Sequence, residues 1–156
     1  MTQSKRRKKM DNGLSTMKSI AQERAKFAWE RASKYNSLET DTEEVKKRKK
    51  KEKDEYSAVV DKVPTYIKTN GLLNTLAFLY SKKGSGKNGE VLQNICDWLA
   101  DDTKNEYHLI PNTHKSDIQL LGYLVDKNTS DARFLIQCTT EVLALFNWLR
   151  RFAKSE

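Results

Sequence analysis

"FLIQCTTEVLALFNWLRRFA", residues 134–153, has the clearest periodicity in the chain. Its apolar residues recur in alternating steps of three and four, which is the spacing that places side chains on one face of an α-helix. A half-buried strand would instead alternate with period two. The stretch therefore predicts an amphipathic helix whose buried face is made of Leu135, Cys138, Val142, Leu145, Leu149 and Phe152.

Two more helices are predicted in the first half of the chain. The first begins after Ser15 and continues to Tyr35, along a stripe of mostly alanine and larger apolar residues. The second is expected to begin near residue 41, because Thr40 and Glu43 have the spacing of a capping box. The polar segment between them is predicted to be a loop.

Two residues predict a joint at the end of the second helix. Pro64 should kink or restart that helix, because proline lacks the N–H that bonds back one turn. Asn70-Gly71 is typical of a helix C-terminus, where glycine is favoured. Pro64 and Gly71 are therefore expected to shape the joint with a strongly apolar helix, "LLNTLAFLY", at residues 72–80.

The remaining sequence completes an all-helical pattern. "VLQNICDWLA" (91–100) has one apolar face, and Ser116 with Gln119 forms a capping box before "IQLLGYLV". No segment of strand length alternates with period two. The 156 residues thus predict an all-α fold, a single-domain bundle of about six helices over residues 14–156, preceded by a flexible basic arm at residues 1–13.

The positive charge is concentrated near the N-terminus. The net charge is +8, and residues 1–55 hold 17 Lys and Arg against 10 Asp and Glu. The densest part is "KKRKKKEK", residues 46–53, on the second predicted helix. Cations at this density fall on every face of a helix and repel one another. This part of the helix should therefore project beyond the core.

The cysteines and the hydropathy pattern indicate where the protein resides. Cys96 and Cys138 are isolated and flanked by apolar positions, which is typical of small core side chains in a reducing compartment. No apolar run is long enough to cross a bilayer, and "KRRKK" at residues 5–9 is not followed by the apolar stretch of a signal peptide. We predict a soluble, cytoplasmic protein with no membrane partner.

"SKKGSGKNGE", residues 81–90, suggests a phosphate-binding loop but lacks the residues that one requires. A P-loop would have glycine at position 81 and Ser or Thr after Lys87, where this chain has Ser81 and Asn88. No strand precedes the segment either, as a dinucleotide-binding turn would need. We interpret it as a basic connector between two helices.

Catalytic chemistry needs grouped acids, bases or nucleophiles, and the sequence shows no such grouping. Its two histidines, His108 and His114, are separated by a loop that contains Pro111, so they do not share a helix face. We therefore predict no catalytic residue, no metal site, no cofactor and no enzymatic activity.

Binding of a nucleic-acid backbone has better support. The basic arm, the run at 46–53 and three lysines in the 81–90 connector fit the electrostatic footprint of such a protein. No element that reads base edges is visible, so contact would be to phosphates. Trp29, Trp98 and Trp148 are better explained as core residues than as stacking platforms. Alternatively, the run is only a solvated helix end. From charge alone, the candidates for RNA contact are Lys46, Lys47, Arg48, Lys50 and Lys51.

Three stretches together resemble a known family. They are "RAKFAWERASKY" (24–35), "VPTYIKTNGLLNTLAFLYSK" (63–82) and "TEVLALFNWLRRFA" (140–153). They are similar to the small, fifth subunit of the type III-B CRISPR–Cas RNA-targeting complex, the Cmr complex. The middle stretch is the most specific, and the resemblance extends from about residue 17 to the end of the chain.

The resemblance implies an all-helical protein without catalytic activity of its own, which stacks as a short filament beside the subunits that hold the CRISPR RNA (crRNA). Its partners would be other Cmr subunits, further copies of itself, the crRNA and the target RNA. The matched positions imply RNA or subunit contacts for Arg24, Lys82, Arg150 and Arg151. For Arg24 and Arg151, a salt bridge to a helix end within the chain is the alternative.

A rival hypothesis is a free-standing basic helical adaptor that binds an acidic protein or ribosomal RNA. It predicts no crRNA in purified complexes and no filament-like stacking. A nuclease would require a cluster of carboxylates, which the sequence does not show.

Overall fold

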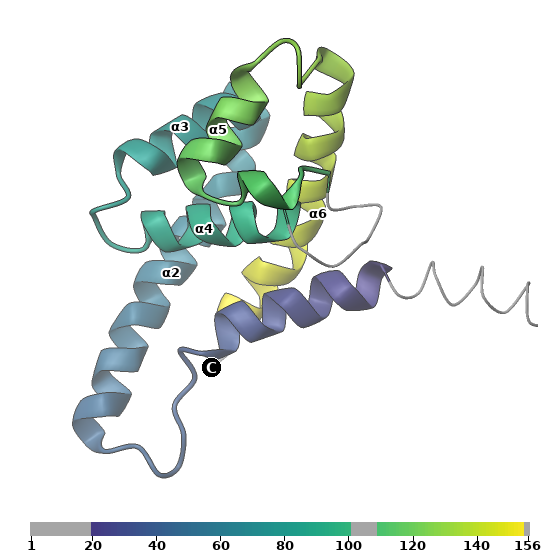
Figure 1. Ribbon diagram of the computed structural model, residues 1–156. Coiled ribbons are helices and arrows are strands. Elements are labelled where there is room, and N and C mark those ends of the chain that lie inside the picture. Colours follow the sequence, from purple (N-terminus) through teal and green to yellow (C-terminus); the bar gives the residue numbers. More distant parts are fainter. Residues whose placement is uncertain (1–19, 101–108, 155–156) are drawn as a thin grey trace, which may run out of the picture.

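The computed structural model describes residues 20–100 and 109–154. Within these ranges the chain forms six α-helices, one 3₁₀ turn and no strand, which confirms the predicted all-α fold (Figure 1). The predicted arm at 1–13 and His108 lie outside the described residues. The elements are residues 20–33, α2 (Glu43–Asn70), α3 (Leu72–Ser81), α4 (Asn88–Leu99), η1 (Asn112–His114), α5 (Asp117–Val125) and α6 (Ala132–Lys154).

The core lies where α6 packs against the second half of α2 (Figure 1). Four of the six residues predicted for the buried face of α6 are completely buried, namely Cys138, Val142, Leu145 and Leu149. The two at its ends, Leu135 and Phe152, are only partly buried. Facing them, α2 buries Tyr56, Val60, Val63, Pro64 and Ile67.

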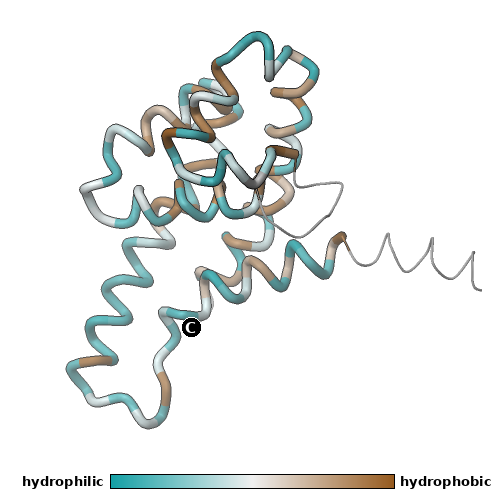
Figure 2. Tube along the Cα trace, viewed as in Figure 1, coloured by the Kyte–Doolittle hydropathy of each residue, from teal (hydrophilic) through white to brown (hydrophobic). Residues whose placement is uncertain are grey.

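The first half of α2 extends away from α3, α4 and α5 (Figure 1). No residue from 43 to 55 is buried, and the first buried side chain of the helix is Tyr56. Figure 2 shows this half of α2 as mostly hydrophilic. The expectation that the basic run projects beyond the core is thereby confirmed. The physical reason is the large desolvation cost of moving so many like charges out of water.

The predicted start of α2 is wrong by two residues. The hydroxyl of Thr42 accepts the Val45 N–H at 3.3 Å, so Thr42 is the N-cap and Thr40 makes no capping box with Glu43. Asp41 lies in the preceding loop, where its carboxylate accepts the Leu38 N–H at 2.8 Å. That hydrogen bond, together with the Lys49 ammonium, lowers the pKa of Asp41 below its ordinary value.

The joint between α2 and α3 consists of a single residue, Gly71. Helix α2 does not restart at Pro64 but continues to Asn70, because the side chains before and after the proline are buried in the same core. Gly71 ends α2 as predicted, and its N–H donates to the Ile67 carbonyl at 2.8 Å. Gly71 has φ 84° and ψ 165°, and Leu72 already belongs to α3.

Two other local predictions have contrasting outcomes. The capping box of Ser116 and Gln119 is confirmed at the start of α5. The prediction that Trp29 belongs to the core is wrong, since 49% of it is exposed. Its ring packs edge-on against Phe152, with centroids 5.4 Å apart, because the 20–33 helix lies on the outside of the C-terminal part of α6.

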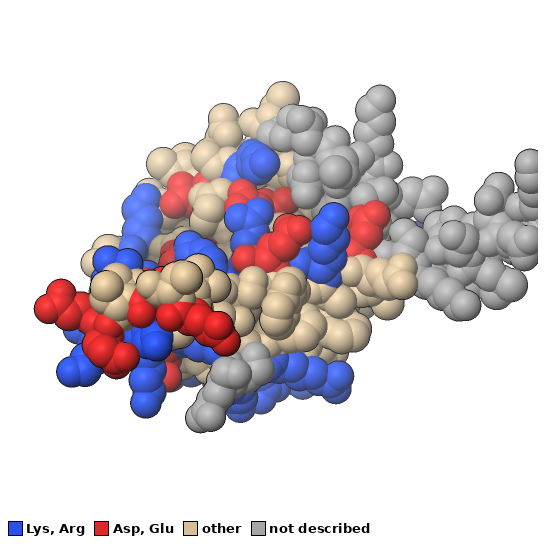
Figure 3. All heavy atoms as spheres, turned by 90° about the horizontal axis from the view of Figure 1, so that it is seen from below, with Lys and Arg blue, Asp and Glu red and all other residues tan. Residues whose placement is uncertain are grey.

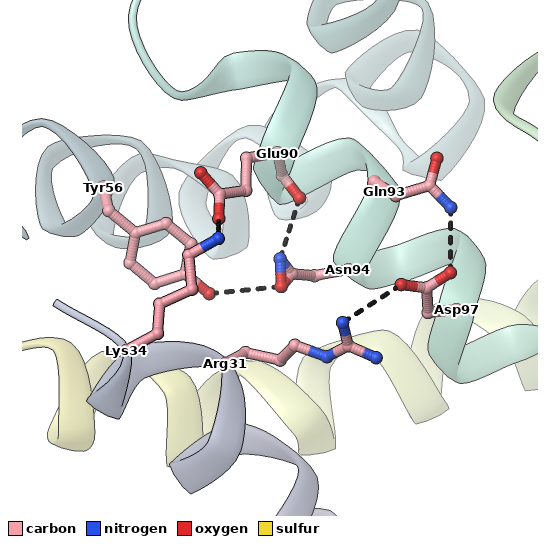
Figure 4. A network of polar contacts seen from close by, with 7 residues as sticks. All are labelled: Arg31, Lys34, Tyr56, Glu90, Gln93, Asn94 and Asp97. Atoms are coloured by element: carbon pink, nitrogen blue, oxygen red, sulfur yellow. Dashed lines mark hydrogen bonds and ion pairs between the residues drawn. The ribbon is translucent and has the colours of Figure 1, made fainter. Parts of the chain in front are cut away.

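Ion pairs hold the 20–33 helix and the turn that follows it to α4, as Figure 4 shows. Arg31 pairs with Asp97 at 3.3 Å, and Lys34 pairs with Glu90. Asn94 connects this surface to the core, because it lies within 3.5 Å of the Tyr56 hydroxyl. The polar groups thus occupy the seam between helices, while the apolar faces meet behind them.

Candidate nucleic-acid interface

The basic run occupies the first turns of α2, and four of its cations are exposed. Lys47, Arg48, Lys50 and Lys51 all project into solvent. Lys46 is half-buried and lies 3.8 Å from Glu43, one turn earlier. The helix therefore presents a compact group of exposed charges, which is an arrangement suited to contact with phosphates.

The other two cations of the run bind back onto the chain. Lys49 Nζ lies 2.7 Å from the Asp41 carboxylate, and Lys53 Nζ donates to the Asn36 side-chain oxygen at 2.7 Å. Both contacts join α2 to the loop that precedes it. From the sequence, the seven cations of the run cannot be told apart. In the structure, Lys49 and Lys53 contact the chain itself and thereby stabilise the fold.

The surface around this end of the molecule carries both signs of charge. Figure 3 views the molecule from below and shows Lys and Arg interspersed with Asp and Glu. Glu39, Glu43 and Glu44 are exposed here, in the preceding loop and the first turn of α2. An RNA backbone would consequently meet the basic turns of α2 and not a uniformly basic face.

Arg24 is engaged inside the protein. Its Nε and Nη2 each donate to a carboxylate oxygen of Glu141 at 2.8 Å, and the Trp98 indole N–H donates to the same carboxylate at 2.9 Å. Glu141 is only 8% exposed and lies in the middle of α6. The salt bridge predicted as an alternative for Arg24 thus exists, with a mid-helix partner instead of a helix end.

The remaining candidates lie on separate parts of the molecule (Figure 1). Lys82 is exposed directly after α3. Near the end of α6, Arg150 Nε lies 3.2 Å from Asp61, and the Arg151 guanidinium lies over the Trp148 ring, 6.0 Å from its centroid. The fold therefore does not gather the predicted site residues into one patch.

Asp61 has a second cationic neighbour in Lys154, whose Nζ lies 3.2 Å from the carboxylate. Burial opposes ionisation, but the hydrogen bonds from Lys154 and Arg150 outweigh it and lower the pKa of Asp61. Arg150 is accordingly part of a small surface ion cluster that joins α6 to α2.

The connector after α3 is confirmed as a link between two helices. It is shorter than predicted, because α4 already begins at Asn88. Lys83 lies 3.3 Å from the Asp117 carboxylate, and Lys87 lies 3.5 Å from that of Glu90. Both of these lysines neutralise carboxylates of their own chain.

Neither thiol is placed for nucleophilic chemistry. Cys96 and Cys138 are buried and free, as predicted, and burial raises the pKa of each to about 12. Across residues 20–100 and 109–154, no group of three or more His, Cys, Asp and Glu residues could hold a metal ion. The described helices also include none that is long and apolar enough to cross a membrane.

An exposed aromatic pair was missed by the sequence reasoning. Tyr66 on α2 and Phe78 on α3 stack with centroids 5.1 Å apart, and they remain 37% and 38% exposed. The sequence suggests a helix at 72–80 that is buried on most sides, and this hides Phe78 among core residues. A helical projection would have separated it from the buried Leu72, Thr75, Leu76 and Leu79.

The fold and surface define a small all-helical protein with an exposed cationic segment on a projecting helix. Comparison with family models identifies its family. Residues 20–156 match the model described as CRISPR-associated protein (Cas_Cmr5). Because the match covers most of the chain, the protein belongs to this family and is a subunit of the type III-B CRISPR–Cas Cmr complex. The resemblance of the three quoted stretches is thereby confirmed.

Proposed function

We propose that the protein is a non-catalytic subunit that stacks with copies of itself beside the crRNA-holding subunits of the Cmr complex. In this position it contacts the guide–target RNA without reading its sequence and supports antiviral defence in the cytoplasm. The observation that carries the proposal is the exposure of four cations, Lys47, Arg48, Lys50 and Lys51, on a half-helix that extends away from the core.

Phosphate contact is the chemistry that suits these side chains. Lysine ammonium groups are strongly hydrated point charges, and they bind phosphates chiefly by replacing condensed counterions. Base pairing between guide and target already supplies the sequence information, so the protein needs only to follow the backbone. No cofactor is required for this role.

Exposed apolar side chains elsewhere support contacts with neighbouring subunits. Ile118 and Val125 on α5 and Ile136 on α6 are each more than 60% exposed, at 64%, 63% and 66%. Apolar groups on a surface favour burial against a partner. A subunit in a filament needs such faces in addition to its contact with RNA.

The proposal is tested by a pull-down of the tagged full chain from its native cell, with sequencing of the retained RNA and identification of the retained proteins. We expect short RNAs that share a repeat-derived 5′ tag, together with several larger subunits in fixed ratio. Retention of ribosomal RNA, or of a single acidic protein without guide RNAs, would instead support a free-standing adaptor.

A further inference from the structure

The stacked pair of Tyr66 and Phe78 is unusual for the amount of aromatic surface that it leaves in solvent. The two rings are nearly parallel, with an interplanar angle of 17°, and each residue is more than one third exposed. A stacked pair that served only the core would be covered by neighbouring side chains. This pair presents two aromatic groups side by side at the surface between α2 and α3.

The charged residues in the stretch of sequence that contains the pair are all positive. Residues 62–89 contain no Asp or Glu and five lysines. Lys62 precedes Tyr66 by one turn of α2, Lys82 follows Phe78 by four residues, and both lysines are exposed. Lys83 and Lys87 face carboxylates of the chain itself, and Lys68, two residues after Tyr66, lies about 200° around α2 from it. This leaves Lys62 and Lys82 as the cations available to flank the aromatic pair.

Helical geometry connects this site with the basic run. At 100° per residue, Arg48, Lys51, Lys62 and Tyr66 lie within a sector of about 60° on α2. Lys51 and Tyr66 are separated by about 22 Å along the axis, at 1.5 Å per residue. Glu44 and Glu55 also lie in this sector. Tyr66 and two exposed cations of the basic run, Arg48 and Lys51, thus lie on one side of α2.

We propose that Tyr66 and Phe78 form a platform on which an unpaired nucleobase of RNA stacks, while Lys62 and Lys82 bind the adjacent phosphates. Stacking on aromatic side chains accepts any base, because every base has a π face, and so it fits a protein that does not read sequence. The absence of Asp and Glu from residues 62–89 favours a polyanion over a protein partner of mixed charge. This inference rests on the proposed contact with RNA and specifies where an unpaired base would lie.

The test compares variants of the full chain for binding to a short fluorescein-labelled single-stranded RNA over a salt series. In the double variant Tyr66→Leu/Phe78→Leu, the leucines keep apolar contact with the neighbouring helices. We expect its affinity to fall by about 5- to 150-fold, the equivalent of about 1–3 kcal/mol for one stacked base, with an unchanged salt slope. Lys62→Gln/Lys82→Gln should instead flatten the log–log salt slope by roughly 1.4.

Trp29→Leu is the matched control, because Trp29 is the most exposed aromatic of those described yet lies on the 20–33 helix. Its RNA affinity should equal that of the unmodified chain. Ultraviolet cross-linking with mass spectrometry gives a second readout that does not depend on the fold of a variant, and the cross-link is expected at Tyr66 or Phe78.

The outcomes separate this inference from the function on which it rests. If the unmodified chain binds RNA with a salt-dependent affinity, but the leucine variant binds equally well and the cross-link lies elsewhere, the platform is wrong and the backbone contact survives. If the leucine variant loses only Cmr subunits from a pull-down, the pair is a protein interface. If the unmodified chain shows no RNA binding, both proposals fail.

Discussion

Glu141 is a charged residue that the structure buries. It lies on α6 between Cys138 and Val142 of the apolar face, and it is nearly as buried as they are. A carboxylate in this position would be costly without partners. Arg24 supplies two hydrogen bonds and Trp98 a third, so the charge is compensated by groups that lie 117 and 43 residues away.

Glu141→Gln is therefore expected to destabilise the protein, since it removes the buried charge with which the Arg24 guanidinium pairs at 2.8 Å. The free energy of unfolding should fall by about 2–4 kcal/mol, as for a part-buried pair that loses one member. Urea unfolding followed by circular dichroism measures the change.

Glu43→Gln is the matched control at the exposed pair with Lys46, where the Glu43 side chain is 85% exposed. Its effect should stay below about 1 kcal/mol. Equal losses for the two glutamine variants would mean that Glu141 contributes no more than a surface charge.

At the scale of the element, the two halves of α2 have different roles. The second half is part of the core, and the first half carries the exposed cations. Removing those cations should leave the fold intact while weakening RNA binding. The ion pair of Lys49 with Asp41 must be retained, because it joins α2 to the preceding loop.

The variant Lys47→Gln/Arg48→Gln/Lys50→Gln/Lys51→Gln tests this division. Each lost phosphate contact should flatten the log–log salt slope for single-stranded RNA by roughly 0.7, and the melting temperature should stay the same. A variant with the exposed Lys26, Lys115, Lys127 and Arg133 changed to Gln has the same net charge and serves as control. Equal slopes for these two variants would identify the run as a solvated helix end.

The joint at Gly71 gives a second prediction at this scale. An added Cβ would meet no atom within 4 Å, so Gly71→Ala introduces no clash. Its backbone, however, has φ 84° and ψ 165°, a region that non-glycine residues avoid at a cost of about 1–3 kcal/mol. We expect thermal unfolding to show a loss of this size.

Gly84→Ala is the control for the joint, because Gly84 also has open space and its φ is not positive. That substitution should change the stability by less than about 1 kcal/mol. A neutral Gly71→Ala would mean that the joint relaxes to another conformation.

At the scale of the whole molecule, the buried thiols and phenols should make the protein less stable at alkaline pH. Burial raises the pKa of Cys96 and Cys138 to about 12, and it raises those of Tyr35 and Tyr56 above their ordinary range. Above pH 9.0, the ordinary thiol pKa, the unfolded chain releases thiol protons that the folded protein retains. The free energy of unfolding should therefore be nearly constant between neutrality and this pH and fall above it.

Urea unfolding at several pH values between neutrality and about pH 11 measures this dependence. Cys96→Ala/Cys138→Ala should show a shallower decline, since only the tyrosines then contribute. An unchanged decline in this variant would assign the effect to other groups.

The elements were more predictable than their contacts. Periodicity and capping residues are local, so the helices, the capping box of Ser116 and Gln119 and the cap at Gly71 were all foreseen. The errors arose where several local choices compete, as at the start of α2, where three neighbouring residues can each cap a helix. Tryptophan side chains are usually buried, which is why the sequence predicts Trp29 in the core. Its position on the outer side of the 20–33 helix leaves half of it exposed instead.

The candidate site follows the same division. Charge density identified the basic run on α2, because a run of like charges can only be solvated or bound to an anion. It could not separate Lys49 and Lys53 from their exposed neighbours, since their partners lie in another segment. Similarly, Tyr66 and Phe78 become a pair only when α3 folds back beside α2.

By itself, then, the sequence determined the all-α class, the approximate helices, the basic half of α2 and the family. Each of these depends on residues that are close together in the chain or on a pattern along it. Only the tertiary structure decided which cations are exposed, that Arg24 serves the interior and that two aromatic rings meet at the surface. These outcomes depend on contacts between residues far apart in the sequence, which exist only once the helices have packed.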